Sequence, residues 1–154
     1  METKNQYRSP VKLGPKVTVT YDDSPAHVGR LKSAVDFIVP VGTEVHAALE
    51  GIVVDVKDDS SIGGDNPSYD KDGNYIEIKH DGDEFSIYEH IKRGGSLVKV
   101  GDKVKTWQLI GFSGDTGWLG GLGPHLHFDI HRYTGKGPED YTTLKIQWKK
   151  SLRK

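Results

Sequence analysis

The chain has 154 residues, a length that predicts one compact domain over residues 1–154. Lys and Arg total 21 against 22 for Asp and Glu, and a formal charge of −1 gives no excess that would attract nucleic acid or an anionic membrane surface. No cysteine is present, which excludes disulfides, thiolate ligands and thiolate nucleophiles. We therefore expect a protein that binds no nucleic acid and does not insert into a membrane. Any metal must be held by His, Asp or Glu.

The pattern of apolar residues predicts an all-β fold. Nineteen glycines and seven prolines interrupt long helices, and apolar residues alternate with polar ones wherever they gather. We expect a compact antiparallel sandwich or barrel, with a core of about residues 16–134 and tails at both ends. In chain order, the expected strands cover residues 16–21, 35–40, 45–49, 51–56, 75–80, 84–90, 97–100, around 104, 109–113, 126–132 and 144–148.

Turn residues predict how some of these segments connect. The strands at 45–49 and 51–56 meet near Glu50-Gly51, and those at 75–80 and 84–90 are joined by Asp81-Gly82-Asp83, which is typical of a hairpin turn. We expect these four strands to form a meander. Two segments, 58–73 and 114–124, have the composition and length of functional loops. The first contains Asp70 and Asp72, but their order relative to glycine is not that of an EF-hand, so we expect a solvated loop there and not a calcium site.

The most unusual feature of the composition is its seven histidines: His27, His46, His80, His90, His125, His127 and His131. In the segment PHLHFDIH, strand alternation places His125, His127, Asp129 and His131 on one face of the strand. An isolated His-x-His pair is also compatible with two exposed strand histidines. We expect His46, His80 and His131, which follow no motif, to be structural or exposed.

Asp36 lies inside the apolar run AVDFIVP, where a carboxylate needs a partner. Burying it unpaired would cost several kcal/mol or force it to keep its proton, so a cation, a lysine or a structural hydrogen bond must compensate. Two imidazoles, one carboxylate and a water form a known catalytic zinc set. His90, in the segment YEH, supplies a further imidazole in a strand.

Four segments together resemble the LytM/lysostaphin-type M23 zinc metallopeptidases, over about residues 27–133. They are VDFIVPVGTEVHAALEGIVVDV, YEH, VKVGDKVKTWQLIGFSGDTG and GPHLHFDI. The resemblance implies the LytM-type fold, a duplicated hybrid motif with long loops around a groove. It also implies zinc, a peptide or peptidoglycan substrate, a monomer, and an extracytoplasmic or secreted location, with no leader present in this chain.

The resemblance also implies roles for the histidines. His127 and Asp36 match metal ligands, and His125 and His90 match the two catalytic histidines. His125 would take a proton from the attacking water while His90 stabilises the carbonyl oxygen, although the two roles could be exchanged.

The first ligand departs from the family pattern. The pattern HxGxD places a histidine four positions before the aspartate, where this chain has Lys32. An HVG segment begins at His27, nine positions before Asp36, so an insert of 9 − 4 = 5 residues would make His27 the first ligand. The other interpretation is that one ligand has been lost.

These observations predict a zinc endopeptidase that hydrolyses peptides of the bacterial cell wall. The alternative is a catalytically degenerate LytM-like module that binds or regulates cell-wall hydrolases. Lys32 favours the alternative, whereas His90, His125 and His127 oppose it. A lipoyl-type carrier is a third hypothesis, but the chain lacks the modified-lysine turn of such domains.

Overall fold

The computed structural model describes residues 1–21, 27 and 29–149. Strands form almost all of the regular structure, which confirms the all-β prediction. Three short 3-10 turns accompany them, η1 (Gly29–Leu31), η2 (Pro67–Asp72) and η3 (Asp81–Asp83). In the described part of the chain, no helix has the length and apolar character needed to span a membrane.

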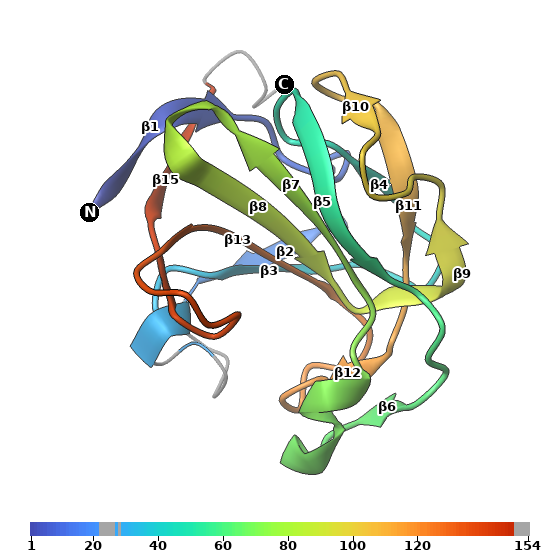
Figure 1. The fold of residues 1–154 in the computed structure, drawn as a ribbon. Helices are drawn as coiled ribbons and strands as arrows, with labels where there is room; N and C mark the ends of the chain where they lie inside the picture. Colours follow the sequence, from blue (N-terminus) through green and yellow to red (C-terminus); the bar gives the residue numbers. More distant parts are fainter. Residues whose placement is uncertain (22–26, 28, 150–154) are drawn as a thin grey trace.

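The largest sheet has eight strands in the order β10-β5-β7-β8-β13-β3-β2, with β14 paired to β13 beside this path (Figure 1). The strands are β2 (Thr18–Thr20), β3 (Val35–Ile38), β5 (Gly51–Lys57), β7 (Tyr75–His80), β8 (Glu84–Glu89), β10 (Lys103–Val104), β13 (Leu126–Tyr133) and β14 (Tyr141–Thr143). All neighbours in it are antiparallel. β5, β7 and β8 form three strands of the predicted meander, and η3 is its predicted turn, with Gly82 at φ 76°. The strand predicted at 45–49 is not part of it and lies in a different sheet.

A second, three-stranded sheet completes the apolar core. Its order is β4-β11-β9, with β4 (Glu44–His46), β11 (Leu109–Ser113) and β9 (Ile91–Ser96). Buried residues of both sheets belong to one hydrophobic cluster, in which Phe128 and Ile130 of β13 join Ile110 of β11. Burying each such side chain stabilises the fold by about 1.5–3 kcal/mol. The apolar face of β13 therefore anchors the strand, and its opposite face remains for polar side chains.

The two ends of the described chain form a parallel pair, β1 (Glu2–Tyr7) with β15 (Lys145–Trp148). The prediction of tails outside a core of residues 16–134 is therefore wrong, because Tyr7 and Leu144 are both buried in that core. The edge strand expected at 144–148 exists as β15, but it pairs with β1 and not with the main sheet. β1 escaped prediction because polar contacts hold it: the buried Glu84 carboxylate accepts hydrogen bonds from the backbone of β1 and from the Tyr7 hydroxyl.

Residues 97–100 do not form the strand that was predicted. The strand of this region is β9, which ends at Ser96, and the apolar side chains of Leu97 and Val100 are exposed. Glycines explain the error. Position 95 of β9 requires glycine, because a Cβ there would lie 2.7 Å from the Lys92 carbonyl oxygen. Sequence patterns treat a glycine as a strand breaker, so they predict a break where this strand continues.

The two predicted loops are joined to each other by a small parallel pair, β6 (Gly63–Gly64) with β12 (Gly117–Trp118). This pair lies at the lower end of the molecule in Figure 1. A Cβ at Gly63 would lie 1.9 Å from the Asp115 carbonyl oxygen, so the approach of the two loops requires glycine at that position. The loop that carries β12 is thereby fixed next to the ends of β8 and β13.

Candidate metal and catalytic site

The main sheet places Asp36 beside His127. β3 lies between β2 and β13, and its register pairs Asp36 with His127 on β13 and with Thr20 on β2. The Asp36 side chain is fully buried, as its apolar sequence context predicts. Since paired residues in antiparallel strands present their side chains on the same face, the carboxylate and the imidazole share one site.

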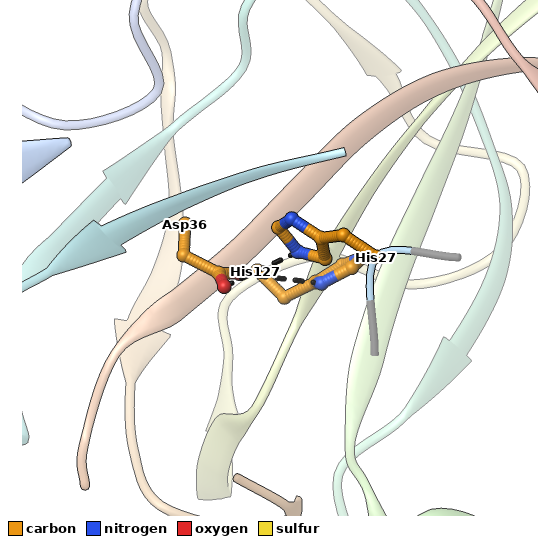
Figure 2. Close-up of side chains that lie close together, drawn as sticks. All are labelled: His27, Asp36 and His127. Atoms are coloured by element: carbon orange, nitrogen blue, oxygen red, sulfur yellow. Dashed lines mark ion pairs between the residues drawn. The ribbon is translucent and has the colours of Figure 1, made fainter. Parts of the chain in front are cut away.

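Three side chains from distant parts of the sequence converge at this point (Figure 2). His27 Nε2 lies 3.2 Å from Asp36 Oδ2, and His127 Nδ1 lies 3.3 Å from Asp36 Oδ1. One donor atom from each residue lies within 4.8 Å of the other two. Within the described residues, His27 Nε2 and both Asp36 oxygens are buried and have no hydrogen-bond partner. Such orphaned atoms are destabilising unless a cation binds them, so the cluster fits a metal ion.

The chemistry of these donors fits zinc. Although burial alone would raise the pKa of Asp36, the His127 and His27 imidazoles beside it hold that pKa well below its ordinary value. The group is therefore a carboxylate at neutral pH. Two imidazole nitrogens and one carboxylate oxygen match a catalytic zinc set that leaves a fourth position for water.

His27 reaches this cluster, whereas Lys32 does not. The side chain of Lys32 is exposed, and η1 separates it from His27. His27 Nδ1 lies against the Tyr21 carbonyl oxygen. Because a carbonyl can only accept, Nδ1 carries the proton and Nε2 presents its lone pair to Asp36. The geometry is that of the five-residue insert, and ligation by His27 remains our prediction.

Carboxylates hold the far side of the His127 ring. His127 Nε2 lies 3.3 Å from Asp129 Oδ2 and 3.3 Å from Glu89 Oε2, so a proton on Nε2 faces these carboxylates while Nδ1 faces Asp36. Burial would lower the pKa of His127, but Glu89, Asp129 and Asp36 raise it well above its ordinary value. A negative field that favours a proton on this ring equally favours a bound cation.

Asp129 is held in turn by His131. His131 Nδ1 donates to Asp129 Oδ1 at 2.7 Å, and its Nε2 lies 2.7 Å from Glu77 Oε2. Burial opposes the charged form, but Asp129 and Glu77 raise the pKa of His131 to about 9. Glu77 had no predicted role, although a carboxylate in the apolar strand YIEIKH is the same signal that identified Asp36.

Two further imidazoles lie beside the cluster and are held by backbone carbonyls. The rings of His90 and His125 are 4.5 Å apart between centroids, and His125 Nε2 lies 3.6 Å from Asp36 Oδ1. His90 Nδ1 donates to the Thr116 carbonyl at 2.6 Å, and His125 Nδ1 donates to the Gly123 carbonyl at 2.8 Å. Burial and the neighbouring imidazoles lower the pKa of His90 to about 3. Burial also lowers the pKa of His125.

These bonds fix the tautomer of both rings. Because each Nδ1 donates its proton to a carbonyl, each neutral ring has its lone pair on Nε2. The Nε2 atoms of both rings can therefore accept hydrogen bonds at neutral pH. Thr116 and Gly123 were not predicted from the sequence because they act through backbone oxygens, which every residue type has.

His46 and His80 lie outside this site. His80 is buried between the Glu50 carbonyl and the Ser86 hydroxyl, with ring nitrogens 2.7 and 2.8 Å from those oxygens. His46 stacks on Trp107 with 4.0 Å between ring centroids. His46 and His80 are therefore structural residues. His131 is also structural, because it contacts Asp129 and Glu77 and is not part of the metal cluster.

Known proteins resemble this chain over the segments that form the site. The sequence profile of peptidase family M23 matches residues 30–139, a range that begins just after His27. An uncharacterized metalloprotease of Buchnera aphidicola subsp. Baizongia pistaciae is 34% identical over 151 residues, which cover 96% of this chain and 35% of the relative. The peptidoglycan DD-endopeptidase ShyC of Vibrio cholerae is 36% identical over 105 residues, 66% of this chain and 21% of ShyC.

Among solved structures, a zinc-containing peptidase from Vibrio cholerae superposes with a TM-score of 0.52 and 32% identity. The match covers 80% of this chain and 33% of that one. The chain thus spans between about a fifth and a third of the length of these relatives. The profile match extends over more than half of the sequence and includes Asp36, His90, His125 and His127. The chain therefore belongs to peptidase family M23.

Proposed function

We propose that this protein is a zinc-dependent endopeptidase that hydrolyses peptide bonds in peptidoglycan, in the stem or cross-bridge peptides, and acts outside the cytoplasm. The observation that carries the proposal is the set of orphaned buried atoms on His27 and Asp36, next to His127 Nδ1. Family membership and the name of the relative ShyC support the choice of substrate.

His27, Asp36 and His127 would hold the metal through Nε2, carboxylate and Nδ1 atoms respectively. Bound zinc supplies Lewis acidity, which polarises a carbonyl and lowers the pKa of water to about 7. Asp36 contributes a full negative charge directly beside the His27 and His127 nitrogens. That charge offsets part of the cation's cost of burial.

His125 is placed to move the proton. Its Nε2 lone pair lies 3.6 Å from Asp36 Oδ1, so an imidazolium formed there is stabilised by the carboxylate. His125 would accept the proton of the attacking water and deliver it to the leaving amine.

The neighbouring His90 has the same tautomer, because its Nδ1 donates to the Thr116 carbonyl, so its Nε2 can only accept while the ring is neutral. It can donate to a carbonyl oxygen only after gaining a proton. Its role as the stabiliser of a developing oxyanion therefore depends on proton exchange within the pair, and the roles of His90 and His125 can be exchanged.

The pair of neutral rings with free Nε2 lone pairs favours an enzyme over a degenerate binding module. Both rings are buried in their neutral forms, and each is oriented by a dedicated backbone acceptor. A binding surface would have no need for two such rings next to a cation site. Lys32 is exposed, whereas His27 lies beside Asp36, which supports His27 and not a lost ligand as the first position.

The test is to measure metal content and hydrolysis on the same purified protein. Elemental analysis should find about one zinc per chain. Purified peptidoglycan with direct cross-links and peptidoglycan with glycine bridges should each be digested, and the released peptides identified by mass spectrometry. Chelation should abolish cleavage and added zinc should restore it. Zinc binding without cleavage of either substrate would support the binding module, and absence of zinc would refute the site.

A further inference from the structure

We propose that Asn74 and Thr116 are positioning residues that lock the backbone and the ring of His90 into one catalytic orientation. This inference rests on the proposed function, because it assigns these residues to the same site. Neither residue belongs to the cluster of His27, Asp36 and His127. Their hydrogen bonds converge on His90 and its neighbour Ile91, and Asn74 also bonds to Ser60.

His90 has an unusual backbone conformation that neighbouring residues must stabilise. It lies between β8 and β9 with φ at +70°, in the left-handed region that residues other than glycine rarely adopt. The Asn74 carbonyl accepts hydrogen bonds from both His90 N, at 2.9 Å, and Ile91 N, at 3.1 Å. One carbonyl therefore holds the two successive amides at the turn.

The Asn74 side chain is fully buried, and all of its hydrogen-bonding capacity is directed to the backbone. Its Nδ2 donates to the Ile91 carbonyl at 3.1 Å and to the Ser60 carbonyl at 2.9 Å. Its Oδ1 accepts from Ser60 N at 3.1 Å. Asn74 thus ties the turn at His90 to the loop that begins at residue 58.

Thr116 connects the same turn to the ring. Its hydroxyl donates to the Ile91 carbonyl at 2.9 Å and accepts from Asn74 N at 3.1 Å. Its own carbonyl accepts the His90 Nδ1 proton at 2.6 Å. The hydroxyl therefore fixes the position of the carbonyl that orients the imidazole, and the β6–β12 pair holds the segment from the other side.

Thr3 provides a matched control for Thr116. It is also buried, and its hydroxyl donates to the Asn5 carbonyl at 2.8 Å and accepts from Gln147 N at 3.0 Å. Each hydroxyl thus makes one bond to a carbonyl and one to an amide, but Thr3 lies in β1. Thr116→Val and Thr3→Val remove equivalent bonds with the same change of shape.

The zinc-loaded variants are compared on the soluble cross-link peptide that the parent protein cleaves fastest. Thr116→Val should lower kcat on the order of 10- to 100-fold, because small displacements of a catalytic group have effects of this size. KM and zinc content should change less than twofold. Thr3→Val should keep kcat within twofold of the parent value, and Thr116→Ser, which retains the hydroxyl, should recover most of the loss. Equal kcat values for Thr116→Val and Thr3→Val would overturn the proposal.

A measurement on the unmodified protein covers the case in which Thr116→Val does not fold. Nitrogen-15 NMR of the imidazoles should show His90 as the Nδ1–H tautomer, with a proton that exchanges slowly with water. The opposite tautomer, or rapid exchange of that proton, would overturn the proposal that the Thr116 carbonyl orients the His90 ring. Because this readout needs no substrate, a protein that cleaves none of the peptides would refute the proposed function while the spectrum still decides the role of Thr116.

Discussion

Two groups of buried histidines in this protein have opposite charge preferences. On β13, His127 and His131 have pKa values raised by carboxylates, whereas His90 and His125 have lowered pKa values and are held by backbone carbonyls. All four rings are buried, so burial alone cannot explain the difference. The partner of each ring decides its charge, because a carboxylate offsets the cost of a buried cation and a neutral carbonyl does so only weakly.

This difference separates two tasks within one site. The carboxylate-held group creates a negative field that suits metal ligation, and the carbonyl-held group keeps neutral rings with free lone pairs. The separation follows the fold: the first group lies on a strand whose register is fixed by the sheet, and the second is oriented by the loop at residues 114–124.

The largest expected effect comes from removing one ring of each group. His127→Ala should lose both zinc and peptide hydrolysis, since it removes a ligand. His125→Ala should lose hydrolysis by at least 100-fold but retain zinc, because a general base contributes about 10²–10⁴-fold to the rate. Zinc content and cleavage rate are measured on both variants. Equal loss of zinc would show that the two groups do not divide their tasks in this way.

A second test examines the first ligand. His27→Ala should weaken zinc binding by more than about tenfold, because one of the three protein ligands is removed. Lys32→Ala should leave zinc affinity within twofold of the parent value, since a protonated amine has no lone pair to donate. Competition with a chromophoric chelator measures both. If His27→Ala binds zinc as the parent does, the insert interpretation is wrong.

A milder substitution should reduce the difference between the two histidine groups without removing a metal ligand. Asp129→Asn replaces the carboxylate beside His127 Nε2 with a neutral amide, so the ring becomes more like the carbonyl-held group. Zinc affinity should fall by about 10- to 100-fold, as is usual when such a partner is lost. Asp59→Asn serves as the control because its carboxylate is exposed and distant in the chain. Unchanged affinity in Asp129→Asn would mean that Glu89 alone orients the ring.

The smallest expected effect is on stability. The folded-state pKa of His131 is about 9, above its ordinary value of 6.5, so its stabilising contribution is complete below pH 6.5 and is lost as pH rises through 9. The parent's free energy of unfolding should therefore fall between these values, by at most about 1.4 kcal/mol per pH unit from this group. His131→Gln should flatten that slope in denaturant titrations. An identical slope in both proteins would contradict the charge assignment.

The sequence predicted the parts of the fold that depend on apolar alternation. The meander of β5, β7 and β8 and the strand β13 were predicted because each alternates or buries apolar residues on one face. β1 was missed because Thr3 and the Glu84 carboxylate, and not an apolar stripe, hold it in place. β9 was missed because its glycines are read as breakers unless the neighbouring backbone is known.

The candidate site divides in the same way. A carboxylate in an apolar strand and a His-x-His alternation are visible in the sequence alone and indicate Asp36, His125 and His127, and the convergence of His27 was one of two open interpretations. The acceptors of His90 and His125 could not be predicted, because backbone carbonyls leave no trace in residue identity. The link from Asp129 to Glu77 through His131 depends on strand order, which the sequence left undetermined.

The parallel pairing of β1 with β15 has a consequence for biosynthesis. Residues of β1 leave the ribosome about 140 residues before their partner strand β15, an interval of roughly 7–30 s at ordinary rates of translation. During that interval the nascent chain can build the meander, while β1 has an unpaired edge that invites association with other chains. We expect a ribosome stalled before residue 145 to display β1 to proteases, and one stalled well beyond β15 to protect it.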